Sequence, residues 1–213
     1  MKARLVEHID PGPFPKLEDL LLEWVWVNKH SAKEWEWNDC PWWYNERASL
    51  STLAGAVWNV GGVVLEEYAS KKRSREGKYS GRCDLYFQIG KTEFIAEAKQ
   101  CWLSTEKNAG STYQYVSESL NMACARARDN RAGTKKREKL IGIVFAVPHI
   151  TPSGVETRGA KKIILEWQQE ILKIKNCALA WVFPLKTWKL EAEDDGYVYP
   201  GIAMLIRNAI VHS

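Results

Sequence analysis

The sequence lacks the features that mark several large classes of protein. Its five cysteines form no Cys-x-x-Cys pair and no ordered framework, so we expect reduced core cysteines and no zinc site. The amino terminus has no apolar region typical of a signal peptide, and the longest apolar runs fall far short of the ~20 residues that a membrane span requires. There is no internal repeat or low-complexity tract. We therefore expect a cytoplasmic protein without a membrane partner.

The composition is that of an ordinary globular protein. Of the 213 residues, 46% are hydrophobic and 26% are charged, which is typical of a chain that buries one sizeable core. No shift of composition along the chain calls for a second domain. We expect a single domain over residues 1–213, with a central unit at about 45–147 between an N-terminal extension (1–44) and a C-terminal extension (148–213).

The net charge of +4 is unevenly distributed. Residues 126–139 hold seven basic and two acidic side chains, so their local excess of five is larger than that of the whole chain. This stretch is either a solvated helix end and loop or a surface that contacts a phosphate backbone. The basic residues that we expect to contact nucleic acid are Arg82, Arg126, Arg128, Lys135, Lys136 and Arg137.

Tryptophan is concentrated near the amino terminus. Six of the eleven tryptophans lie within the twenty residues from Trp24 to Trp43. Aromatic rings can stack on unpaired bases, but most tryptophans are packing residues. We expect packing for this cluster, with Trp42 and Trp43, next to Pro41, as the exceptions.

The stretch from Gly81 to Gln100 predicts a β-hairpin. Two runs of alternating apolar residues flank Gly90-Lys91, and a two-residue loop with glycine first is typical of a type II′ turn. This turn fixes the register of the two strands. The predicted opposite pairs are Ile89 with Thr92, Phe87 with Phe94, Leu85 with Ala96, and Asp84 with Glu97.

One face of this hairpin is predicted to carry charge. Side chains alternate along a strand, so Asp84, Glu97 and Lys99 share one face. The predicted apolar face holds Cys83, Leu85, Phe87, Phe94, Ala96 and Ala98. Two carboxylates across a rung repel each other, and a divalent metal between them would remove the repulsion. The alternative is an exposed face on which Glu97 and Lys99 pair in solvent.

Periodicity predicts the other elements along the chain. Residues 1–15, 71–78, 101–110 and 148–159 are expected to be irregular. Helices are expected over 16–29, 45–60, 112–130 and 163–175, and strands over 63–68, 140–147, 178–183 and 197–207. Glu46 falls on the buried stripe of the second helix, where an acid needs a reason. The alternative is an ordinary first-turn glutamate that the helix dipole favours. If that helix instead continues to Tyr68, Glu66 or Glu67 takes the place of Glu46.

Residues 45–147 thus give the order helix, strand, strand, strand, helix, strand, with an acid on the first helix and Asp plus Glu-x-Lys on the second and third strands. This arrangement resembles the core of the PD-(D/E)XK, or restriction-endonuclease-like, nuclease superfamily. The resemblance implies an α/β fold with a mixed central sheet flanked by helices. The Trp-rich helical segment before it and a helix and two strands after it would be additions.

The resemblance also implies roles for individual residues. Asp84 and Glu97 would bind Mg²⁺ or Mn²⁺, Lys99 would assist the attacking water or stabilise the charged transition state, and Glu46 would support the metal site. Gln100, next to the lysine, would orient water.

Two features depart from the family pattern. Cys83 stands where the motif has proline. Gln114 is followed four residues later by Glu118 rather than tyrosine, which argues against a helicase-associated exonuclease subtype.

These observations favour a metal-dependent nuclease that cleaves phosphodiester bonds by attack of water. The resemblance favours DNA over RNA and a DNA endonuclease of the restriction, defence or mobile-element type. Cutting of both strands would suggest a homodimer, which stays open. Two other functions also stay open: a nucleic-acid-binding module on the same fold without turnover, and a protein-interaction domain with a Trp-rich contact surface.

Overall fold

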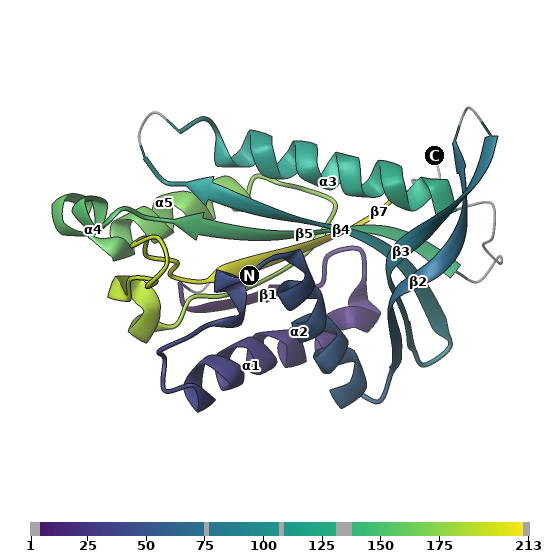
Figure 1. The fold of residues 1–213 in the computed structure, drawn as a ribbon, viewed down its shortest axis with the longest axis horizontal. Coiled ribbons are helices and arrows are strands. Elements are labelled where there is room, and N and C mark those ends of the chain that lie inside the picture. Colours follow the sequence, from purple (N-terminus) through teal and green to yellow (C-terminus); the bar gives the residue numbers. More distant parts are fainter. Residues whose placement is uncertain (1–4, 75–76, 107–108, 131–137, 211–213) are drawn as a thin grey trace.

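A computed structural model describes residues 5–74, 77–106, 109–130 and 138–210, which form an α/β fold (Figure 1). In this part of the chain a seven-stranded mixed sheet has the order β1-β6-β7-β5-β4-β3-β2. Only the β4–β5 pair is parallel among the described neighbours. The strands are β1 (Glu7–Asp10), β2 (Val63–Ser74), β3 (Gly77–Ile89), β4 (Thr92–Ser104), β5 (Glu138–His149), β6 (Ala178–Val182) and β7 (Ile202–Asn208).

Helices cover both faces of the sheet (Figure 1). The α-helices are α1 (Glu18–Glu34), α2 (Glu46–Asn59), α3 (Thr112–Asp129), α4 (Pro152–Arg158) and α5 (Ala160–Ile171), and short 3-10 helices occupy Pro15–Leu17, Pro41–Trp43 and Leu185–Lys189. The helices α1 and α2 pack on one face, and α3 and α5 pack on the other. This arrangement confirms the predicted α/β class with a mixed sheet between helices.

Strand β5 lies at the centre of the sheet and is apolar on both faces. Ile143 and Phe145 pack into the core under α1 and α2, whereas Val144 and Ala146 pack into the core under α3 and α5. A strand buried on both faces has a continuous apolar sequence. The prediction of a buried central strand here is confirmed.

The predicted β3–β4 hairpin is also confirmed, in three of its four predicted pairs. Leu85 pairs with Ala96, Phe87 with Phe94 and Ile89 with Thr92. Gly90 has φ of 57°, and Lys91 is not among the residues with positive φ, as a type II′ turn requires. The rings of Phe87 and Phe94 stack with their centroids 4.6 Å apart.

Four stretches that we expected to be irregular carry regular structure, and one of them is residues 101–104, which belong to β4. Residues 7–10 form the edge strand β1. Residues 71–74 and 77–78 belong to β2 and β3, which pair as far as Ser74 and Gly77. The expected loop 148–159 contains α4, whose N-cap Thr151 accepts a hydrogen bond from Gly154 N and whose first residue is Pro152. Those two residues are a normal helix start and could have predicted it.

The tryptophans mostly pack, but the expected exceptions were wrong. Trp42 is completely buried and donates its indole N–H to Tyr199 O at 3.0 Å, and Trp43 packs against the same core. All five cysteines are unpaired, and four are buried. Among the described residues, no helix has the length and apolar character needed to cross a membrane.

Candidate active site

The candidate site lies where β3 separates from β4. Pairing of these strands ends at Leu85 and Ala96, although β4 stays paired with β5 as far as Ser104. Strand β3 instead continues with β2, and this two-stranded ribbon extends past the end of α3 (Figure 1). We call the segment Glu97–Gln100, which β3 no longer pairs, the open edge of β4.

Two carboxylates bind backbone amides along the open edge. Asp84 Oδ2 accepts a hydrogen bond from Ala98 N at 2.8 Å, and Glu46 Oε2 accepts one from Gln100 N at 2.9 Å. On an edge that β3 has left, these amides would otherwise lose their partner. The position of Glu46 on the inward face of α2, predicted from its spacing, brings it to this edge.

Lys99 lies between the two amides and pairs with Glu46. Its Nζ is 3.6 Å from Glu46 Oε2, and about a quarter of its side chain is exposed. The neighbouring Gln100 is held at both ends of its amide, because it accepts from Ser49 Oγ at 2.7 Å and donates to Tyr44 O at 2.6 Å. The side-chain amide that we expected to orient water therefore ties the open edge to the start of α2.

Glu97 points to a different set of partners. Its Oε1 accepts hydrogen bonds from Lys72 Nζ at 2.7 Å and from Asn130 Nδ2 at 2.8 Å, and its side chain is almost fully buried. Lys72 comes from β2, and Asn130 is the C-cap of α3. The sequence interpretation missed both residues. The position of Asn130 at a helix end is the one signal that could have indicated it.

The two carboxylates therefore do not face each other across a rung as predicted. Strand β3 changes face between Cys83, which packs with Ile95 beneath α3, and Leu85, which packs on the α2 side. Glu67, next to this change on β2, has φ of 46°. The alternative of a Glu97–Lys99 ion pair is also wrong, since Glu97 pairs with Lys72 and Lys99 with Glu46.

Glu66 and Glu67, the alternative acids, lie on β2 because α2 ends before them. Gly61 has φ of 77° and the helix ends at Asn59, so a helix continuing to Tyr68 is excluded. Glu66 accepts from Ser51 Oγ at 3.3 Å. Glu67 lies between Arg47, at 2.6 Å, and Arg82, at 3.3 Å, and both arginines are largely exposed. Glu67 thus joins the start of α2 to the strand that carries Asp84.

The predicted nucleic-acid contacts are partly described. Arg82 is exposed beside Asp84, and Arg126 is exposed on α3. Arg128 donates to Ala209 O at 3.0 Å, a contact that holds the end of α3 to the chain after β7. Lys135, Lys136 and Arg137 lie outside the described residues.

Hard oxygen donors fit a magnesium ion better than zinc. The hydrogen bonds found within the described ranges engage only one oxygen of each carboxylate: Asp84 Oδ2, Glu97 Oε1 and Glu46 Oε2. No cluster of three or more His, Cys, Asp or Glu side chains in the described part of the chain could hold a metal. Mg²⁺ commonly uses one or two carboxylates with water and substrate phosphate, and the oxygens of Asp84 and Glu97 are of the donor type that it prefers.

The thiols beside the site are poor nucleophiles. Burial raises the pKa of Cys83 to about 11, and the negative charge of Glu97 adds to the effect. Burial also raises the pKa of Cys101, although a hydrogen bond with Ser119 opposes it. Both thiols are therefore protonated near neutral pH.

Comparison of the chain with protein-family models, with curated proteins and with solved structures found no match.

Proposed function

We propose that the chain is a metal-dependent nuclease whose active site is the open edge of β4. One observation carries the proposal: Glu46, Asp84 and Lys99 from three separate elements meet on the backbone of residues 98–100, next to Glu97. The element order α2-β2-β3-β4-α3-β5, with β4 parallel to β5, supports a restriction-endonuclease-like core. Under this proposal the segments before α2 and after β5 are additions to that core.

The donor set suggests how the site would treat a phosphodiester. Asp84 and Glu97 would hold Mg²⁺ or Mn²⁺, which supplies hydroxide at neutral pH and neutralises charge on the leaving oxygen. Lys99 places a cation beside the reacting phosphate and stabilises the charge that develops there. Glu46 holds the Lys99 ammonium at 3.6 Å and so positions it. Glu46 is a positioning residue in this scheme.

The exposed arginines support a nucleic-acid substrate. Arg47 and Arg82 lie on either side of Glu67, close to Glu46 and Asp84, and each is more than two-thirds exposed. Exposed guanidinium groups bind phosphate oxygens and make binding dependent on salt. DNA is our preferred substrate, with a restriction, defence or mobile-element role that follows from the resemblance alone.

A second function is favoured by one specific observation. Every acid of the candidate site already has a partner within the protein: Asp84 and Glu46 bind backbone amides, and Glu97 binds Lys72 and Asn130. Such bonds also suit acids whose only role is to hold α2 and the β2–β3 ribbon against the open edge of β4. The alternative is therefore a nucleic-acid-binding module without catalytic turnover.

Cleavage assays separate these functions. Supercoiled plasmid, linear duplex DNA and single-stranded RNA would be incubated with the full chain, with and without Mg²⁺ or Mn²⁺. Lys99→Met is the test variant, and Lys91→Met, in the exposed hairpin turn, is the matched control. We expect metal-dependent cutting that Lys99→Met loses and Lys91→Met keeps. If no substrate is cut and calorimetry detects no heat of Mg²⁺ binding, the nuclease proposal fails and the binding module without turnover is favoured.

A further inference from the structure

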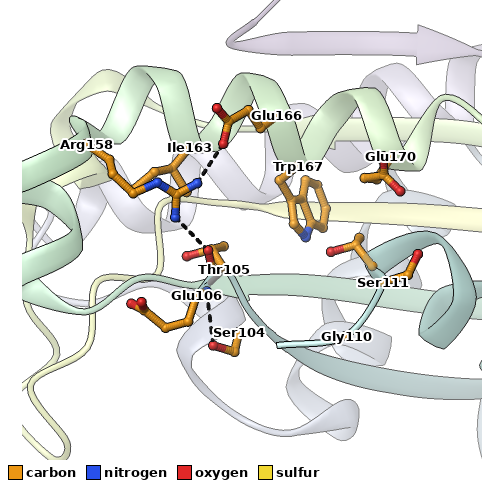
Figure 2. A pocket seen from close by; sticks show the side chains of 11 residues that line it. Ser104, Thr105, Glu106, Gly110, Ser111, Arg158, Ile163, Glu166, Trp167 and Glu170 are labelled. Atoms are coloured by element: carbon orange, nitrogen blue, oxygen red, sulfur yellow. Dashed lines mark hydrogen bonds and ion pairs between the residues drawn. The ribbon is translucent and has the colours of Figure 1, made fainter. Parts of the chain in front are cut away.

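Two neighbouring hollows lie at the Ser104 end of β4, which is the end away from the β3–β4 hairpin turn. The first has a volume of about 260 Å³ and lies between the end of β4, the start of α3 and the helix α5 (Figure 2). The second, of about 390 Å³, is lined in part by Trp102, Tyr115 and His149. Both are lined by Ser104, Gly110 and Thr112, so the two hollows adjoin, and we call them together the depression.

The first hollow holds a buried donor that lacks an acceptor. Trp167 is only 3% exposed, and its indole Nε1 has no hydrogen-bond partner among the described residues. In Figure 2 the indole extends from α5 with its nitrogen directed into the space above Thr105 and Ser111. A buried donor without a partner costs free energy, and most such groups in proteins are paired. A hydrogen-bond acceptor in the hollow would give this N–H a partner.

The described charges around the first hollow disfavour a phosphate as that acceptor. Among the residues that the structure describes, Glu106, Glu166 and Glu170 line it together with one base, Arg158. Arg158 is already engaged, since it donates to Thr105 O at 2.8 Å and to Glu166 Oε2 at 2.6 Å (Figure 2). An anion would meet an excess of carboxylates. A neutral ring that offers both an acceptor for Trp167 and N–H donors for the carboxylates matches this lining.

The second hollow offers aromatic surface. Trp102 is 42% exposed and Tyr115 is 57% exposed, and both line it. His149 contributes a third ring, which contacts Tyr197 edge-on with centroids 5.0 Å apart. Exposed aromatic rings of this kind stack on the flat faces of nucleobases. The two hollows thus supply stacking and edge recognition side by side.

We propose that this depression binds unpaired nucleobases, with one base held in the first hollow by Trp167 and its neighbour stacked on Trp102 or Tyr115. The volume of the first hollow is below the ~300 Å³ at which sites for drug-sized ligands begin, which suits a single base. Ser104 lies five residues after Lys99 on β4, or about 16 Å along the strand. One strand of nucleic acid can therefore reach both sites. The inference rests on the proposed function only where it connects the depression to the open edge of β4. If both proposals hold, the substrate of the nuclease is single-stranded or locally unpaired nucleic acid.

Binding without metal tests the proposal independently of cleavage. Labelled single-stranded DNA and RNA 12-mers would be titrated with the full chain in chelator, beside an abasic 12-mer of equal charge and a duplex. Trp167→Phe removes the indole donor, and Trp188→Phe is its control, because Trp188 Nε1 already donates to Phe183 O at 3.0 Å. Trp102→Ala removes the stacking ring, and Trp26→Ala, half-exposed on α1, is its control.

We expect the 12-mers with bases to bind more tightly than the abasic strand and the duplex. Trp167→Phe should weaken binding about fivefold, and Trp102→Ala about tenfold or more, with both controls unchanged. In the unaltered protein, the indole N–H resonance of Trp167 should shift on titration. This NMR measurement decides the question even if Trp167→Phe fails to fold.

Other outcomes separate the two proposals. Equal binding of the abasic strand, or an unmoved Trp167 resonance, would overturn the base-binding depression and leave a nuclease intact if cleavage is seen. Base-dependent binding without cleavage of any substrate would remove the nuclease and leave the depression. Absence of binding to every single strand would overturn the depression whatever the cleavage result.

Discussion

Lys72 Nζ lies 2.7 Å from Glu97 Oε1, and both side chains are almost completely buried. Asn130 donates a second hydrogen bond to the same oxygen at 2.8 Å. The pair joins the β2–β3 ribbon to β4 beyond Leu85 and Ala96, where β3 and β4 are no longer paired. A candidate metal ligand is therefore also a structural tie.

Removing one partner of this pair should destabilise the protein strongly. Lys72→Met leaves the Glu97 carboxylate buried without its cation, with Asn130 as the remaining hydrogen-bond donor among the described residues. Loss of one partner from a buried ion pair costs about 3–5 kcal/mol, so we expect a loss of that size in the free energy of unfolding, measured by urea denaturation.

The double variant Lys72→Met/Glu97→Gln provides the control for that measurement. It removes both charges, and we expect it to recover most of the lost stability, because no unpaired charge stays buried. A double variant as unstable as Lys72→Met alone would contradict a direct coupling between these two residues.

Gly142 of β5 lies directly beneath Cys124 of α3. A Cβ at this position would lie 2.6 Å from Cys124 N and 2.7 Å from Cys124 Sγ. We expect Gly142→Ala to lower the free energy of unfolding by about 1–3 kcal/mol, the usual cost of overpacking. Thermal and urea denaturation measure this loss.

Gly55 on α2 is the matched control for that substitution. Its added Cβ would have Val27 Cγ1 at 4.0 Å as its neighbour, and alanine in a helix interior is favoured over glycine by about 0.5–1 kcal/mol. Gly55→Ala should therefore stabilise the protein. Equal effects of the two substitutions would show that α3 does not constrain position 142.

The β3–β4 hairpin and the central strand could be predicted because their signals are local. Gly90-Lys91 sets the turn, and the alternating residues on either side fix which rungs face each other. The apolar run of β5 has no polar side chain that could face solvent. Both faces of this strand must therefore be buried, which is the case in the middle of a sheet. Glu46 was found by its spacing on the inward stripe of α2.

The rest of the site depends on contacts that are distant in sequence. Residues 71–78 have no apolar alternation, so nothing distinguishes a paired ribbon from a loop until β2 and β3 meet. The burial of Lys72 follows from that ribbon and could not be anticipated. The change of face between Cys83 and Leu85 was missed because strict alternation assumes a regular strand.

His8 should make stability depend on pH. It lies on the edge strand β1, 8% exposed, with its ring centroid 4.5 Å from that of Trp181. Burial lowers the pKa of His8 below its ordinary value of 6.5, against the opposing charge of Asp10. The unfolded chain therefore binds the proton more readily, and this contribution to stability is present above pH 6.5 and is lost as pH falls below it.

Urea denaturation between pH 5 and pH 8 checks this expectation. His8→Gln should show a flatter fall in the free energy of unfolding below pH 6.5 than the unaltered chain. The carboxylates contribute equally to both proteins, so the difference between the two curves isolates His8. Parallel curves would mean that His8 titrates alike in the folded and unfolded states.

Asp84 allows the structural and catalytic roles of one carboxylate to be separated. Its Oδ2 accepts the hydrogen bond of Ala98 N, and the amide oxygen of asparagine can accept the same bond, whereas alanine cannot. We expect Asp84→Ala to cost about 1–3 kcal/mol of stability, the penalty for a lost partner, and Asp84→Asn to cost much less. Both variants should lose metal-dependent cleavage, because neither supplies a charged ligand.

Asp129→Asn is the control for Asp84, since the Asp129 carboxylate accepts only a long contact from the Tyr79 hydroxyl in the described part of the chain, at 3.3 Å. It should keep both stability and cleavage. A stable Asp84→Asn protein that still cuts DNA would show that Asp84 holds β3 to the open edge of β4 without holding metal. A stable Asp84→Asn protein that binds DNA but no longer cuts would assign Asp84 both roles, because the loss of activity could not then come from unfolding of the open edge.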